Sequence, residues 1–101
     1  MTKKELFFRF AKEVTLLRFE IGFEEDSIQE GEKYQDEVRI EYCEDRIRSK
    51  TGQIEGILRL ARTFKLDVEN INLLSFNLAA SFNYEDIEKM NENPFLKEVR
   101  K

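Results

Sequence analysis

The sequence predicts an all-α domain, a helical hairpin or bundle built on one long amphipathic helix. Only four glycines and one proline occur among 101 residues, which is fewer turn residues than a β-sandwich of this length needs. Apolar residues recur at helical spacing through most of the chain. Because neither an internal repeat nor a low-complexity tract divides the sequence, we expect a single domain over residues 1–101.

The first helix is predicted over residues 3–23, with Thr2 as its N-cap. We expect it to end where an acidic and polar stretch runs from Glu24 to Gly31. The apolar residues of this helix recur three and four positions apart: Leu6, Phe7, Phe10, Ala11, Val14, Leu17 and Ile21.

The second helix, predicted over residues 32–65, carries the clearest pattern. Two columns of residues, each with a spacing of seven, form an a/d seam that continues into the next segment. They are Ile40, Ile47, Ile54, Ala61 and Val68, and Cys43, Lys50, Ile57, Phe64 and Ile71. Lys50 is the polar member of the seam, and the helix would break near this residue if Ser49–Gly52 formed a turn. A helix of this length spans about 50 Å, so its apolar stripe needs a partner helix.

A β-hairpin is the alternative for the middle of the chain. Apolar and polar residues also alternate along residues 16–23 and 37–43, which is the period of a strand. An α+β fold with a hairpin of these two segments, followed by helices, therefore stays open.

Two shorter helices and a tail complete the prediction. Asp67 and Asn83 are typical N-caps and predict helices over residues 68–82 and 84–91, with Pro94 opening a tail over 94–101. Helix 68–82 has one charged residue and apolar residues on two sides, which predicts that it is either the central helix of a bundle or packed against another chain.

Charge is strongly segregated in this chain of net charge −4. Residues 24–45 carry a net −8 and residues 46–66 a net +5. An antiparallel pairing of the long helix with a second copy would set acid against base, which predicts a homo-oligomer. Its interface candidates are Ile40, Ile47, Ile54, Ile57, Leu73 and Phe76. The candidates for electrostatic contact with another protein are Glu24, Glu25, Asp26, Glu41, Glu44 and Asp45.

The composition excludes several kinds of chemistry. The chain has no histidine and one cysteine, Cys43, which excludes disulfide frameworks, His/Cys zinc sites and Ser–His or Cys–His nucleophile pairs. Phosphate-binding loops and EF-hand loops are absent from the sequence. We therefore expect no enzyme, no catalytic residue, no metal and no cofactor. No apolar run approaches the ~20 residues of a membrane span, and the N-terminus lacks a signal peptide's cleavage site, so a cytoplasmic protein that does not contact a membrane is expected.

Residues 57–71 resemble the helix-turn-helix family of DNA-binding regulators. Ala61 stands at the small position of the first helix, Leu66-Asp67 at the turn and cap, and Ile71 at the buried position of the second helix. The resemblance implies DNA binding, with contacts from Arg48, Arg59 and Arg62. The sequence departs from the family at Lys65, where the turn usually has glycine, and in a would-be recognition helix without Lys or Arg.

The sequence therefore predicts a small acidic protein-binding domain, a self-associating adaptor or an inhibitor of another protein. In composition it resembles accessory proteins of phages and mobile elements, some of which act against host nucleases or defence complexes, although it shares no motif with them. A DNA-binding regulator and a purely structural helical oligomer are the alternatives.

Overall fold

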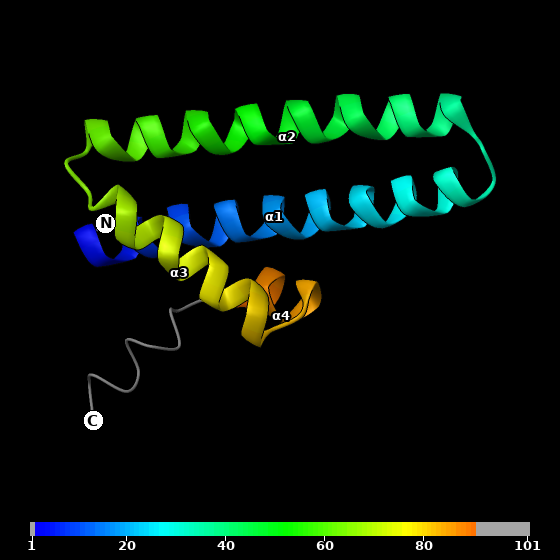
Figure 1. Ribbon diagram of the computed structural model, residues 1–101. Helices are drawn as coiled ribbons and strands as arrows, with labels where there is room; N and C mark the ends of the chain where they lie inside the picture. Colours follow the sequence, from blue (N-terminus) through cyan, green and yellow to red (C-terminus); the bar gives the residue numbers. More distant parts are fainter. Residues whose placement is uncertain (1, 91–101) are drawn as a thin grey trace.

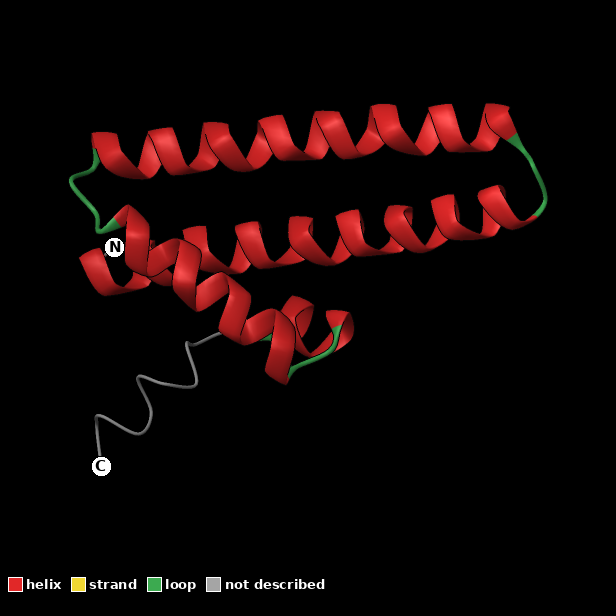
Figure 2. Ribbon diagram, viewed as in Figure 1, coloured by secondary structure: helices red, strands yellow, loops and turns green. Residues whose placement is uncertain are grey.

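The computed structural model describes residues 2–90, which form four helices and no strand (Figure 2). The helices are α1 (Lys3–Lys33), α2 (Glu37–Thr63), α3 (Val68–Ser81) and α4 (Tyr84–Lys89). The all-α prediction is confirmed. The β-hairpin alternative is wrong, because residues 16–23 and 37–43 lie inside α1 and α2.

Each helix begins at a side chain that accepts a hydrogen bond from the backbone amide three residues later. The four caps are Thr2, Asp36, Asp67 and Asn83. Such caps satisfy one of the amides that the first helical turn leaves without a partner. Three of them, Thr2, Asp67 and Asn83, are the residues that the sequence predicts.

The end of α1 and the start of α2 differ from the prediction. Helix α1 continues ten residues past Phe23, and α2 starts at Glu37 rather than at residue 32. Residues 24–33 contain no proline, and two of their acidic side chains form ion pairs with arginines of α2. This polar stretch, which resembles a turn in the sequence, is therefore a helical segment held against α2. No break occurs near residue 50, because Ser49–Gly52 is helical. The connection between the two helices is the short turn of residues 34–36.

The later boundaries lie closer to the prediction. Phe82 is the C-cap of α3 rather than its last residue, and α4 ends at Lys89. The predicted end of the last helix at residue 91 and the tail over 94–101 lie outside the described residues.

The ends of α1 and α2 close with the same backbone motif. Gln35 and Lys65 have φ angles of 56° and 59°, the left-handed conformation that usually selects glycine. After α1, the amide of Asp36 donates to the carbonyl of Gly31 at 2.8 Å, and after α2, that of Leu66 donates to Ala61 at 3.1 Å. These bonds span the last turn as in a Schellman motif, so non-glycine residues terminate both helices.

Helices α1 and α2 form a long antiparallel hairpin, and α3 crosses α1 at the end of the hairpin far from the 34–36 turn (Figure 1). Helix α4 packs on α1 as well, so α1 contacts all three other helices. The core lies where α1, α2 and α3 meet. Its buried residues are Phe10, Ala11, Val14, Ile54, Ala61 and Ile71. We call this part of the molecule the three-helix end.

The opposite part of the hairpin, residues 24–46, contains only α1, α2 and their turn. We call it the arm. Its buried residues are Gly31 and Cys43, and Gly31 allows close approach, because a Cβ there would lie 3.0 Å from Cγ1 of Ile40. The arm therefore has little apolar core of its own.

The a/d seam of α2 is covered by α1 from the same chain. Ile54 and Ala61 are buried, and Ile40, Ile47 and Ile57 are half-buried. Because the seam finds its partner helix within the chain, its length no longer requires a second copy.

Candidate protein-binding surfaces

Ion pairs between α1 and α2 fix the register of the hairpin. Going toward the turn, Glu20, Glu24 and Glu30 of α1 pair in order with Lys50, Arg46 and Arg39 of α2, at 3.0, 2.6 and 3.2 Å. Lys50 is thereby accommodated within the apolar seam, since its stem is buried and its ammonium reaches Glu20. Two bases of the net-positive segment 46–66, Arg46 and Lys50, are thus paired with acids of the same chain.

Glu24 belongs to this internal network. Its side chain is 16% exposed, and the hydrogen bond from Arg46 Nε holds the pKa of its carboxyl below the ordinary value. The same hydrogen bond raises the pKa of Arg46. Of the six predicted acidic contact residues, Glu24 is therefore the one engaged across the hairpin.

The other five acidic candidates are exposed. Asp45 pairs with Arg48 on the same helix at 2.8 Å, with both side chains largely in solvent. Glu25, Asp26, Glu41 and Glu44 make no ion pair within residues 2–90. These carboxylates give the arm a negative surface that internal bases do not neutralise.

Two large apolar side chains lie within this negative surface. Val38 is 80% exposed and Tyr42 is 60% exposed. Helical spacing places Val38, Glu41, Tyr42 and Asp45 on one side of α2, away from the seam residues. The guanidinium of Arg46 faces the Tyr42 ring at 5.6 Å and donates to its hydroxyl at 3.4 Å, which orients the ring. We call these four residues the acidic face.

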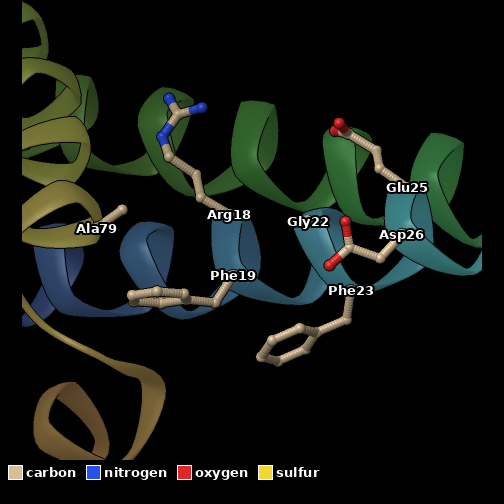
Figure 3. A pocket seen from close by; sticks show the side chains of 7 residues that line it. All are labelled: Arg18, Phe19, Gly22, Phe23, Glu25, Asp26 and Ala79. Atoms are coloured by element: carbon tan, nitrogen blue, oxygen red, sulfur yellow. The ribbon is translucent and has the colours of Figure 1, made fainter.

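A groove lies where α3 crosses α1 (Figure 3). Its volume is about 310 Å³, and we call it the crossing groove. The residues that line it are Arg18, Phe19, Gly22, Phe23, Glu25, Asp26 and Ala79. Aromatic rings lie along one side, and the acidic side chains of Glu25 and Asp26 lie about two turns of α1 away from Arg18.

Arg18 is held in place by α3. Its Nε donates to Oγ of Ser75 at 2.8 Å, its Nη2 donates to Oδ1 of Asn72, and its guanidinium lies 3.8 Å from the centre of the Phe76 ring. Partial burial lowers the pKa of Arg18. No carboxylate of residues 2–90 forms an ion pair with it, so a fixed cation faces the groove without an anionic partner.

The outer side of α3 is apolar and exposed. Leu73 and Phe76 are 58% and 53% exposed, whereas Ile71, Ser75 and Leu78 are fully buried on the inner side. The prediction that α3 is the central helix of a bundle is wrong for the described part of the chain, because only one side of it is covered. This apolar surface borders the crossing groove, because Phe76 contacts Arg18, which lines the groove.

The structure separates the predicted interface candidates into two groups. Leu73 and Phe76 lie together on α3, whereas Ile40, Ile47, Ile54 and Ile57 follow the seam against α1. Sequence reasoning missed Arg18 and Tyr42. The spacing of four between Val38 and Tyr42, opposite the seam, was a usable signal for the acidic face. Nothing in the sequence marked Arg18, since its partners lie more than 50 positions away.

The helix-turn-helix residues form a corner between α2 and α3. Lys65 adopts the left-handed conformation of the family's glycine, so this departure does not prevent the turn. Arg48, Arg59 and Arg62 are exposed on α2. Helix α3, which would be the recognition helix, carries no Lys or Arg.

Residues 2–90 hold no group of three or more carboxylate, cysteine or histidine side chains placed to bind a metal ion. In the same part of the chain, the helices are not long and apolar enough to cross a membrane. Comparison with protein-family models gives no match, and neither the curated proteins nor the solved structures give one.

Proposed function

We propose that this protein is an acidic protein-binding domain, an adaptor or an inhibitor, that contacts a basic surface of its partner through the acidic face of the arm. The observation that carries the proposal is the exposure of Val38 and Tyr42 among carboxylates that have no base across the hairpin. Apolar side chains at the centre of a contact and charges around them are typical of protein interfaces.

The two kinds of residue would have separate roles. Glu41 and its neighbours would attract a basic partner over a distance and raise its association rate. Tyr42 would supply the desolvated contact that slows dissociation. Because the acidic face lies on a regular helix and Arg46 orients the tyrosine ring, little conformational entropy is lost on binding.

A basic groove that normally holds nucleic acid is one surface that would accept this face. Carboxylates spaced along α2 would take the place of phosphates there. A domain that occupies such a groove excludes the nucleic acid, and this is how the protein would act as an inhibitor.

Selection from a phage-displayed library of random peptides tests the proposal without a known partner. The immobilised protein should enrich peptides that combine Lys or Arg with apolar residues. Fluorescence anisotropy with one enriched peptide should show binding that weakens with added salt. Tyr42→Ala should weaken that binding about tenfold or more.

Two control variants make the experiment specific. Leu60→Ala removes another half-exposed apolar side chain of α2, outside the arm, and should leave the affinity unchanged. Glu41→Gln should weaken binding, and Glu55→Gln, which removes the same charge at an exposed position nearer the three-helix end, should weaken it less. The proposal fails if the enriched peptides are not basic, or if Leu60→Ala weakens binding as much as Tyr42→Ala.

A further inference from the structure

The crossing groove has opposite charges on either side of a glycine. Arg18 lies one helical turn before Gly22 on α1, and Asp26 lies one turn after it, and all three line the groove. Arg18 has no ion-pair partner among residues 2–90, and neither has Asp26. The charges lie on the same helix, eight residues apart, so they cannot readily satisfy one another.

This arrangement is self-complementary under two-fold symmetry. A two-fold axis that passes between two copies of α1 at the level of Gly22, across the helices, brings the position one turn before Gly22 in one copy opposite the position one turn after it in the other. In a symmetric dimer each contact occurs twice, with the roles of the two chains reversed. Arg18 would therefore meet the partner's Asp26, while Asp26 would meet the partner's Arg18.

The surroundings of Gly22 permit such an approach. A Cβ at this position would have no atom within 4 Å, so the space above Gly22 is open. Phe23 and Ala79 border this space, and Phe76 lies beneath the Arg18 guanidinium. The apolar side chains supply burial, and the glycine lets a second backbone come close.

We propose that the crossing groove binds a second copy of this chain, with the two α1 helices crossing at Gly22 and reciprocal Arg18–Asp26 ion pairs on both sides of the crossing. This surface is separate from the acidic face, so the dimer leaves the acidic faces of both chains free. It also differs from self-pairing along the a/d seam, because α1 of the same chain already covers that seam.

Sedimentation equilibrium of the full chain over a wide concentration range tests the proposal. The wild-type protein should approach twice 12.1 kDa at high concentration and dissociate more readily with added salt. Gly22→Leu should return it to a monomer. This variant should still fold, because leucine is a better helix former than glycine and its Cβ meets no neighbour.

Gly56→Leu is the matched control, because Gly56 lies mid-helix in α2 and a Cβ there also has no neighbour within 4 Å. This variant should keep the wild-type mass. Asp26→Arg should weaken the dimer at least about tenfold, and it should do so without loss of helicity in circular dichroism, because Asp26 is exposed.

A wild-type protein that stays monomeric, or a dimer that survives Gly22→Leu, overturns the proposal. A dimer that Gly56→Leu also dissociates overturns it too, since the contact would then include α2. The proposed function is tested separately: a monomer that still binds basic peptides overturns only the dimer, and a dimer without such binding overturns only the role of the acidic face.

Discussion

The two ends of the molecule are built from the same two helices but are stabilised in different ways. At the three-helix end, α1, α2 and α3 pack through fully buried side chains, among them Val14, Ala61 and Ile71. In the arm, Arg39 and Arg46 hold the helices together through exposed or half-exposed ion pairs. Apolar burial contributes about 1.5–3 kcal/mol per large side chain, whereas an exposed ion pair contributes about 0–1 kcal/mol.

This difference indicates that stability and binding are provided by different parts of the molecule. We therefore expect the three-helix end to provide most of the folding free energy, while the arm carries charge and exposed aromatic residues. Binding surfaces are commonly found in the less stable part of a fold.

The largest effect is expected in the core of the three-helix end. Ile71→Ala should lower the free energy of unfolding by about 3 kcal/mol, because it leaves a cavity among fully buried neighbours. Ile40→Ala, in the half-buried seam of the arm, should cost about 1 kcal/mol. Urea denaturation followed by circular dichroism measures both. Equal losses of unfolding free energy in the two variants would show that the arm is packed as tightly as the core.

A smaller effect is expected at the ion pair next to the arm. Glu20→Ala should destabilise the protein by about 2 kcal/mol, because it leaves the ammonium of the largely buried Lys50 side chain without its partner. Asp45→Ala, which removes the exposed pair with Arg48, should cost less than about 0.5 kcal/mol. Chemical denaturation compares the two variants. If both had the same small effect, Lys50 would be solvated rather than held by Glu20.

The two left-handed residues predict a modest gain in stability. Lys65→Gly and Gln35→Gly should each stabilise the protein by about 0.5–1 kcal/mol, because glycine adopts φ angles near 56° and 59° without steric cost. Thermal melts detect this as a higher Tm. A lower Tm would mean that the entropy which glycine adds to the unfolded chain outweighs the relief of strain.

The smallest effect is a pH dependence at Glu24. Its pKa in the folded protein lies below the unfolded value of 4.5, so its pair with Arg46 stabilises the fold above that pH and is lost as pH falls through the lowered pKa. Glu24→Gln should therefore reduce the Tm slightly at pH 7 and leave it unchanged at strongly acidic pH. A Tm difference that is the same at both pH values would contradict this account.

The fold class could be predicted because the seven-residue seam and the capping residues are local signals. The seam predicts α2, and Asp67 marks the start of α3. The end of α1 could not be predicted in the same way. Residues 24–33 resemble a polar turn until their partners Arg39 and Arg46 are known, and these partners come from the next helix. The segregated charges were visible in the sequence, but it did not show which of them pair within the chain, as Glu24 and Arg46 do.

The roles of the candidate contact residues stay predictions. Glu41 and Asp45 are exposed, and Leu73 and Phe76 are exposed on α3 within residues 2–90. Arg18 could not be found from the sequence, because its environment arises only when α3 crosses α1.

Native-state hydrogen exchange compares the arm with the three-helix end within one molecule, since it measures opening free energies segment by segment. We predict that amides of residues 28–44 in the arm exchange through a local opening of lower free energy than amides of residues 8–17 and 54–61 at the three-helix end. If all three segments exchanged with the same free energy, that of global unfolding, the arm would be no less stable than the core, which would contradict the account.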